Sequence, residues 1–463
     1  MKTRLILITS LALLATCQAS LNSRPTASPL PSPEEKEEET LPQISFSDYF
    51  ENKTMRMDFY HCGNADEEMY FFDELKEEPY FAGSYVSLRD SFDYGNQRFV
   101  LLDKETGLEI YSFHYCTLWG EWQCTPEAKT TSLGMPESVV FPYPKRDAIA
   151  QIWSRGNPHD PRFHDLQTVV PWELKFEYEI KADNYFVRGF SKLYDTEDIH
   201  VVGDPHTCLD IVLIPEGYTE GEREQFVRDC QFFASEFFSF EPWTSNEQRV
   251  NMRLVWAPSA ESGVSIPAIG KWRSTAIKAN YFTFDSERYQ MTYDFQAVRD
   301  IAGHAPYDYI YILTNSDKYG GGGIYNFYGI GAGHEARGTS GRVHVHEFGH
   351  QMLGLGDEYV EIGNTTSDQY DPAVEPWEAN LTTKVDVSRK PWAYALMPSD
   401  SIHGNTLPEG GGYLEHGIWR PYEHCLMNTL AYGFCPVCLQ AVTDYLDYIT
   451  RQARNLRLRF HTM

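Results

Sequence analysis

The chain has 463 residues, of which 42% are hydrophobic, and its 66 acidic residues against 39 basic ones give a formal net charge of -27. This composition is typical of a folded globular protein and excludes a wholly disordered one. The negative charge argues against a nucleic-acid-binding protein, because phosphate binding needs a basic surface. At roughly 100–200 residues per domain, the length predicts two or three domains.

Residues 1–19 have the pattern of an export signal. Lys2 and Arg4 precede an apolar run, residues 5–15, that is too short to span a bilayer, and small or polar residues follow it. Two cleavage positions fit this pattern. Cleavage after Ala19 releases a secreted protein. Cleavage before Cys17 leaves a lipid anchor on Cys17 of a cell-surface or outer-membrane lipoprotein, because the preceding residues resemble a relaxed bacterial lipobox.

The next segment, residues 20–44, is rich in Pro and Glu, which predicts an extended and solvated linker. No later stretch reaches the roughly 18 uninterrupted apolar residues of a transmembrane helix, so none is predicted. Two domains are expected after the linker, with bounds 45–198 and 199–463.

Hydrophobic and polar residues alternate in the first domain. The alternation over residues 172–180 predicts a strand with one buried face, and residues 98–102 and 110–115 have similar patterns. Several strands of this kind with turns between them favour an antiparallel β-sandwich. Four scattered histidines in this domain are expected to be ordinary hydrogen-bonded side chains: His61, His114, His159 and His164.

The pattern changes near residue 200. Residues 209–214 and 309–313 are apolar strands. Between them, four residues recur at helical spacing and therefore share one helix face: Phe226, Cys230, Phe233 and Phe237. Alternating strands and helices predict an α/β domain, which together with the sandwich makes a multidomain α+β protein.

Residues His346-Glu347-Phe348-Gly349-His350 form an HExxH motif. Residues four apart on a helix share a face, so both imidazoles can bind one Zn²⁺ at about 2.0–2.1 Å. Glu347 is placed to accept a proton from the attacking water and to transfer it to a leaving amine. The motif therefore predicts a hydrolytic zinc site.

Such a site needs a third protein ligand and an open position for water. Gly354 and Gly356 allow the chain to turn back after the helix, and Asp357 follows, seven residues after His350. His344 lies on a different helical face and is not expected to bind the metal. The alternative carboxylate ligands are Glu358 and Glu361.

The motif and its flank, residues 346–359, resemble the active-site signature of the immunoglobulin A peptidase family of metzincin-like zinc endopeptidases. Further segments match that family in the same order: 214–219 (IPEGYT), 258–267 (PSAESGVSIP), 315–321 (NSDKYGG), 425–427 (CLM) and 434–438 (FCPVC). The resemblance covers about 200–450, and the preceding region is similar to the family's N-terminal β domain. It implies a metzincin-like domain in which His346, His350 and Asp357 bind zinc and Glu347 is the general base.

The resemblance also implies that Met427 is the Met-turn, an apolar floor beneath the metal, although an ordinary core methionine packs in the same way. Gly and the third ligand come four and seven residues after the second His, instead of three and six as in the broader metzincin pattern. Thr429 stands where some metzincins have a Tyr, so a transition-state Tyr comes from elsewhere. The candidates are Tyr413, Tyr422 and Tyr432.

The run of four glycines at 320–323 fits two interpretations. It lies beside an edge strand that aligns a peptide substrate through main-chain hydrogen bonds, or it is a flexible turn without substrate contact. It is not a phosphate loop, because the Gly-Lys-Ser/Thr ending and the following helix are missing.

Eight cysteines follow the leader, and in an exported protein they can be oxidised to disulfides. Cys116 and Cys124 are placed to staple a hairpin. Cys435 and Cys438 have the spacing of a redox motif. A structural role, as a disulfide or as packed thiols, is the simpler interpretation, and a redox or second-metal role is the alternative.

These patterns predict an exported zinc metalloendopeptidase that acts on extracellular proteins, with immunoglobulin A as the substrate that the family name suggests. One alternative is a surface protein that binds a host protein or glycan through its β domain and carries a degenerate zinc site. The other is a zinc hydrolase that acts on a non-peptide bond. The sequence predicts no oligomeric state.

Overall fold

A computed structural model describes residues 43–156, 170–333, 340–390, 392–393 and 407–451. The expected export signal and almost all of the linker lie outside these ranges, as do His159 and His164. From Ile44 onward, the described residues belong to one compact unit. Within the described ranges, no helix is both long enough and apolar enough to cross a bilayer.

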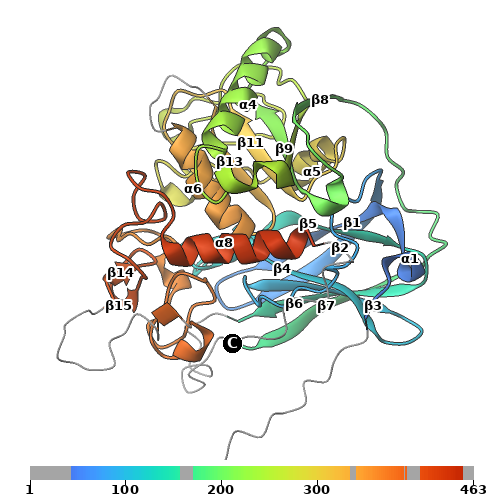
Figure 1. Cartoon of the computed structure of the whole chain (residues 1–463), viewed down its shortest axis with the longest axis horizontal. Coiled ribbons are helices and arrows are strands. Elements are labelled where there is room, and N and C mark those ends of the chain that lie inside the picture. The colour runs from blue at the N-terminus through green and yellow to red at the C-terminus, as the bar shows by residue number, and fades with distance from the viewer. Residues whose placement is uncertain (1–42, 157–169, 334–339, 391, 394–406, 452–463) are drawn as a thin grey trace, which may run out of the picture. The chain divides into compact units, whose positions relative to one another are not determined.

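Two antiparallel sheets form the first region (Figure 1), with strand orders β2-β1-β5 and β4-β3-β6-β7. The strands are β1 (Phe50–Gly63), β2 (Glu68–Glu78), β3 (Gln97–Asp103), β4 (Glu109–Tyr115), β5 (Leu133–Pro144), β6 (Ala148–Arg155) and β7 (Trp172–Ile180), and a short helix, α1 (Phe46–Tyr49), precedes them. The sheets share one core, in which Phe99 of β3 stacks on Phe141 of β5 with ring centroids 4.8 Å apart. The predicted antiparallel sheets are confirmed, and their common core makes them a sandwich.

The second region contains a six-stranded mixed sheet with the order β12-β13-β11-β9-β10-β8. Its strands are β8 (Asp195–His200), β9 (Leu209–Glu216), β10 (Val250–Trp256), β11 (Tyr309–Thr314), β12 (Gly321–Gly323) and β13 (Tyr328–Ala332). The inner strands run parallel, and β12 and β8 are antiparallel edges. Every residue of β9 is buried, as expected for a parallel strand covered on both faces. The strand β8 straddles the expected domain boundary at 198.

Helices and small strands complete the second region. The helices are α4 (Arg223–Phe237), α5 (Phe295–Ala302), α6 (Ser340–Leu353) and α8 (Pro436–Ile449), and a hairpin is formed by β14 (Glu409–Gly411) and β15 (Leu414–Trp419). Short 3-10 helices are η1 (Pro205–Thr207), η2 (Glu220–Glu222), η3 (Thr244–Arg249), η4 (Pro267–Ile269), η5 (Thr283–Asp285), η6 (Ser367–Gln369) and η7 (Val387–Arg389). The predicted strands at 209–214 and 309–313 are confirmed as β9 and β11.

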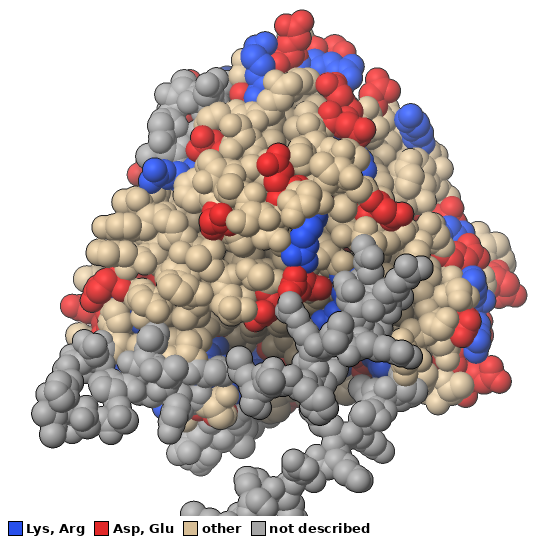
Figure 2. Space-filling model, in the orientation of Figure 1, with Lys and Arg blue, Asp and Glu red and all other residues tan. Residues whose placement is uncertain are grey.

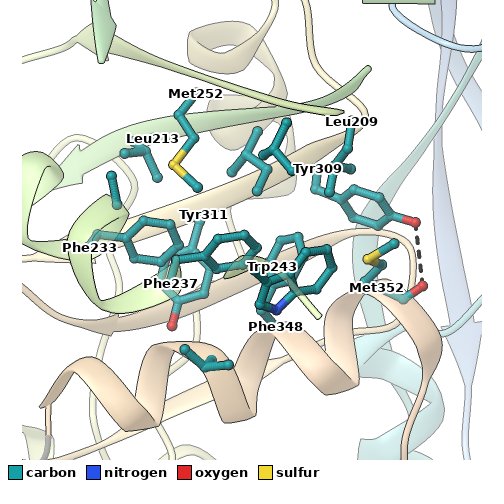
Figure 3. Packing of buried hydrophobic residues seen from close by; sticks show 14 of the residues in the cluster. Leu209, Leu213, Phe233, Phe237, Trp243, Met252, Tyr309, Tyr311, Phe348 and Met352 are labelled. Atoms are coloured by element: carbon teal, nitrogen blue, oxygen red, sulfur yellow. Dashed lines mark hydrogen bonds between the residues drawn. The ribbon is translucent and has the colours of Figure 1, made fainter. Parts of the chain in front are cut away.

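One face of the mixed sheet packs against α4, α6 and α8 through a single hydrophobic core. All four α4 residues that were expected to share a face are fully buried: Phe226, Cys230, Phe233 and Phe237. Figure 3 shows aromatic rings of α4 lying between the sheet and Phe348 of α6. Phe237 and Phe348 meet edge to face, with ring centroids 5.1 Å apart. The core thus fixes one side of α6 and leaves its other side for the HExxH histidines.

The other face of the sheet is covered by α5 and, unexpectedly, by the first region. Trp119 and Trp122 of α2 (Leu118–Gln123) belong to the same buried cluster as Ile310 and Ile312 of β11. The prediction of a hairpin between Cys116 and Cys124 was wrong. The segment is helical because the Thr117 hydroxyl accepts a hydrogen bond from the Gly120 amide at 2.9 Å and so caps the helix.

Candidate active site

The HExxH motif lies on α6, and its residues divide between two environments. Phe348 is fully buried in the core on one side of the helix. His346, Glu347 and His350 line a cavity of about 560 Å³ on the other side. Because α6 is held by core packing on the opposite face, the positions of these three side chains are fixed by a rigid element.

Asp357 joins the two histidines in a close triangle. The Nε2 atoms of His346 and His350 lie 3.1 Å apart, and Asp357 Oδ1 lies 3.2 Å and 3.3 Å from them. Ligand atoms about 2.0–2.1 Å from one zinc ion in tetrahedral geometry are separated by about 3.3 Å. The structure therefore brings together the three predicted ligands at metal-binding distances.

Hydrogen bonds to the other imidazole nitrogens show why these atoms need a cation between them. His346 Nδ1 donates to the Leu426 carbonyl at 3.0 Å, and His350 Nδ1 donates to the Leu355 carbonyl at 2.5 Å. A carbonyl oxygen only accepts, so in the neutral rings both Nε2 atoms carry lone pairs. Asp357 Oδ1 is also buried and accepts no hydrogen bond. Three lone pairs facing one another fit a bound divalent metal ion.

Burial and neighbouring charges have opposite effects on the pKa values of His350, Asp357 and Glu347. Burial lowers the pKa of His350, but the neighbouring Asp357 carboxylate outweighs this effect and raises it to about 9. Burial raises the pKa of Asp357, and the two histidines more than reverse this, so its pKa lies well below the usual range. The pKa of Glu347 is raised, because burial outweighs the attraction of the same histidines.

Three contacts hold Asp357 in place after the helix. Gly354 has φ +56°, and a Cβ atom there would lie 2.3 Å from the Trp377 ring, so only glycine fits this turn. Asn380 accepts a hydrogen bond from the Gly356 amide at 2.8 Å and donates to its carbonyl at 2.9 Å. The Tyr413 hydroxyl donates a hydrogen bond to Asp357 Oδ2 at 2.7 Å, which leaves Oδ1 facing the two histidines.

The alternative ligands lie elsewhere. Glu358 points into a buried cluster of cysteines, with its Oε1 3.5 Å from Cys438 Sγ. Glu361 lines the cavity but pairs with Arg288 at 3.1 Å. His344 is buried against Phe233 and the Tyr311 hydroxyl, and burial lowers its pKa to about 3. None of the three side chains approaches the triangle of His346, His350 and Asp357 as a ligand.

Met427 is fully buried beneath α6. A Cβ atom on Gly349 would lie 3.0 Å from its sulfur, so the small fourth residue of the motif allows the methionine to approach the helix. The Met427 carbonyl accepts a hydrogen bond from the Glu358 amide at 2.8 Å. This packing matches the floor expected of a Met-turn, and it also ties the floor to the loop that carries Asp357.

The three candidates for a transition-state tyrosine, Tyr413, Tyr422 and Tyr432, have different surroundings. Tyr413 lines the cavity and donates a hydrogen bond to Asp357, so its hydroxyl positions that carboxylate. Tyr432 stacks on His424 at the surface, and Tyr422 packs against the core away from the cavity lining. Five tyrosines that were not among these candidates also line the cavity: Tyr289, Tyr319, Tyr325, Tyr359 and Tyr370.

The glycine run forms an ordered edge strand, β12, and is not a flexible turn. Two of its glycines, Gly321 and Gly323, pack closely on α6. A Cβ on Gly321 would lie 3.1 Å from Glu347 Oε1, and one on Gly323 would lie 2.4 Å from the Glu347 carbonyl. Gly321 already bonds through its amide to Arg288 and through its carbonyl to Gln290. The backbone of Gly321 is therefore not free to bind a substrate. Alignment of a peptide along β12 stays a prediction for Gly322 and Gly323.

The first region also contributes to the cavity, which the sequence analysis did not foresee. Glu121 of α2 lines it and accepts a hydrogen bond from the Tyr289 hydroxyl. Burial raises the pKa of Glu121 to about 7, although the Tyr289 hydrogen bond lowers it. No local pattern around Glu121 distinguishes it from a surface carboxylate, since only the packing of α2 on the sheet brings it here.

Two family models match the chain. The model described as IgA Peptidase M64 matches residues 198–406, which include α6 and Asp357. The model described as Peptidase M64 N-terminus matches residues 45–163, in the sandwich region. The chain belongs to the IgA peptidase M64 family. A comparison with curated proteins gave no match.

Membership of the M64 family confirms the resemblance seen in the sequence. It makes the chain a metallopeptidase, and a peptidase of this family has protein or peptide substrates. The grouping of His346, Glu347 and His350 around one point is consistent with that classification.

Proposed function

We propose that this M64 peptidase is an exported, zinc-dependent endopeptidase with a metzincin-like catalytic region. The observation that carries the proposal is the convergence of two imidazole Nε2 atoms and an unbonded carboxylate oxygen within 3.1–3.3 Å of one another. Glu347 lies next to them in an open cavity. Three protein ligands and one open position are typical of a catalytic zinc site, not a structural one.

Each residue has a defined role in this proposal. His346, His350 and Asp357 hold the zinc ion, and their orientation is set by the Leu426 and Leu355 carbonyls and the Tyr413 hydroxyl. When bound, zinc polarises the scissile carbonyl and lowers the pKa of water toward about 7. Glu347 accepts the proton of the attacking water and transfers it to the departing amine nitrogen.

The surroundings support a protein substrate in an extracellular setting. The cavity is lined by both polar and aromatic side chains from both regions of the chain, which suits a peptide. On the face shown in Figure 2, the described acidic and basic side chains are interspersed, without a continuous basic surface for nucleic acid. The leader supports export, either as a secreted protein or as a lipoprotein anchored at Cys17. Immunoglobulin A is a candidate substrate by family name.

A gel-based cleavage assay tests this proposal. Purified protein is incubated with immunoglobulin A and with denatured casein, beside Glu347→Ala, Glu347→Gln and a matched control, Glu224→Gln, on the exposed side of α4. We expect wild type and Glu224→Gln to cleave. Both Glu347 variants should bind zinc normally and lose activity by at least about 10²-fold. Cleavage by the Glu347 variants at the wild-type rate would overturn the assigned mechanism.

The same assay separates the two alternative functions. A peptide-directed inhibitor of zinc proteases blocks an endopeptidase but not a zinc hydrolase of a non-peptide bond. Stoichiometric zinc without cleavage of either substrate favours a surface-binding protein or a narrowly specific peptidase. The pattern of immunoglobulin A fragments distinguishes selective cleavage from general proteolysis of unfolded chains.

A further inference from the structure

A second group of metal-binding side chains lies beneath the catalytic residues. Cys425, Cys435, Cys438 and Glu358 place one sulfur or oxygen atom each within 4.8 Å of all the others. They come from three segments: the loop after α6, the turn before Met427 and the N-terminus of α8. All eight cysteines in the described ranges are unpaired, so no disulfide accounts for this cluster.

The separations within the cluster match a tetrahedral zinc site. Cys438 Sγ lies 3.7 Å from Cys425 Sγ, 3.6 Å from Cys435 Sγ and 3.5 Å from Glu358 Oε1. With Zn–S bonds of about 2.3 Å and a Zn–O bond of about 2.0–2.2 Å, a tetrahedron gives about 3.8 Å between sulfurs and about 3.5–3.7 Å between sulfur and oxygen. A disulfide needs about 2.05 Å.

The surroundings of Glu358 point to a missing positive charge. Its side chain is fully buried, and its Oε2 has no hydrogen-bond partner. Asn380 donates to Oε1 at 2.9 Å. Within the described part of the chain, no Lys, Arg or His forms an ion pair with it. A buried carboxylate beside three cysteine sulfurs is costly unless a cation is bound among them.

The local structure favours thiolates at this point. Cys435 is the N-cap of α8, and Cys438 lies in its first turn, where the helix dipole stabilises negative charge. The Cys435 amide also donates to Cys425 Sγ at 3.3 Å. Such amide-to-sulfur hydrogen bonds are typical of metal-bound thiolates, because they offset part of the ligand charge.

We propose that Cys425, Cys435, Cys438 and Glu358 bind a second, structural Zn²⁺ ion. All four positions are filled by protein, and the cysteines and Glu358 are between 0% and 3% exposed, so this site has no place for water or substrate. Its function is to fasten together the three segments that form the floor of the catalytic site. Glu358 follows the ligand Asp357, and Cys425 precedes Met427 by two residues.

Metal counting on the full-length protein tests this proposal without measuring activity. The variants are His346→Ala/His350→Ala, which removes the catalytic ligands, Cys435→Ser/Cys438→Ser, and the matched control Cys62→Ser/Cys208→Ser outside the cluster. Each protein is saturated with Zn²⁺, desalted and analysed by elemental mass spectrometry. We expect two zinc ions per chain in wild type and control, and one in each of the other two.

Cobalt provides a readout that does not depend on the folding of a cysteine variant. In the His346→Ala/His350→Ala protein, Co²⁺ should bind with one equivalent and give the near-ultraviolet charge-transfer absorption of thiolate ligands. Glu358→Gln in that background should weaken Co²⁺ binding by at least about tenfold, while circular dichroism reports the fold. Absence of metal and of thiolate absorption in the His variant would overturn the proposal. A protein mass lower by two hydrogens, which indicates a disulfide in the cluster, would overturn it as well.

Discussion

The two candidate metal clusters of this chain lie next to each other but differ in chemistry and exposure. The first consists of nitrogen and carboxylate ligands, with His346 and His350 side chains 12% and 16% exposed, on an open cavity. The second is rich in sulfur, and Cys425 and Cys438 are fully buried. Openness, not ligand number alone, distinguishes a site that can admit substrate from one that can only hold the fold together.

Adjacent residues serve the two clusters. Asp357 turns toward the histidines, while Glu358 turns toward the cysteines, as side chains on opposite sides of an extended backbone do. Neighbouring residues of a second segment are divided in the same way: the Leu426 carbonyl orients His346, and Cys425 belongs to the buried cluster. Because each segment carries one residue of either cluster, a change in the buried cluster should alter the positions of the side chains in the open one.

The two clusters should differ most in how readily a chelator removes their metal ions. We expect a chelator to remove metal from the exposed histidine site first and abolish peptidase activity, which added Zn²⁺ restores. The sulfur site should lose its ion only at higher chelator concentration, together with a fall in melting temperature. Zinc content, activity and thermal unfolding measured across one chelator titration check this order. Simultaneous loss of both ions with unfolding would remove the distinction.

Asn380 links the two clusters and should matter to both. It bonds to both polar groups of Gly356 and to Glu358, and it is fully buried. Asn380→Ala leaves these groups unsatisfied and should lower the free energy of unfolding by about 1–3 kcal/mol per lost buried partner. Denaturant unfolding measures the effect, with the exposed Asn52→Ala as control. An unchanged stability would show that water replaces the amide and that the clusters are not coupled through it.

Substitution of Tyr413 should change only the open cluster, where it should weaken zinc binding without removing the ion. Tyr413→Phe removes the hydrogen bond to Asp357 Oδ2 without changing the ring. Loss of such a partner typically lowers metal affinity by about 10–100-fold. Competition with a zinc-binding dye measures this for the catalytic ion, with the surface residue Tyr432→Phe as control. Equal affinities for the two variants would assign Tyr413 to another role.

The sequence predicted the parts of this molecule that depend on local spacing. The strands β3, β4, β7, β9 and β11 and the buried face of α4 follow from periodicity, and these elements were confirmed. The buried face predicted for β7 was wrong in part, because only Ile180 is fully buried and Leu174 is 44% exposed. The histidines of α6 share a face because they are four residues apart. Asp357 was placed correctly near them because two glycines allow the chain to reverse direction before it.

The features that the sequence did not predict depend on contacts between segments far apart in the chain, and local residue spacing carries no information about such contacts. Glu358 was predicted as an alternative ligand beside the histidines but lies against the cysteine cluster, since Cys425, Cys435 and Cys438 are about 70–80 residues away in the sequence. Asn380 reaches Gly356 from a loop with no regular pattern. The predicted hairpin at Cys116 was wrong because the Thr117 hydroxyl caps a helix between the two cysteines. Glu121 reaches the cavity only because α2 packs on the mixed sheet.

That packing of α2 has a consequence for how such a chain can evolve. Trp119 and Trp122 cover a sheet that belongs to the catalytic half, so this half does not have a complete surface of its own. Transfer of residues 199–463 into another gene would remove Trp119 and Trp122 from the buried cluster that they share with β11, and would discard Glu121 from the cavity. We therefore expect the two halves to be inherited together, with divergence concentrated on the outer strands of the sandwich and α2 held nearly constant.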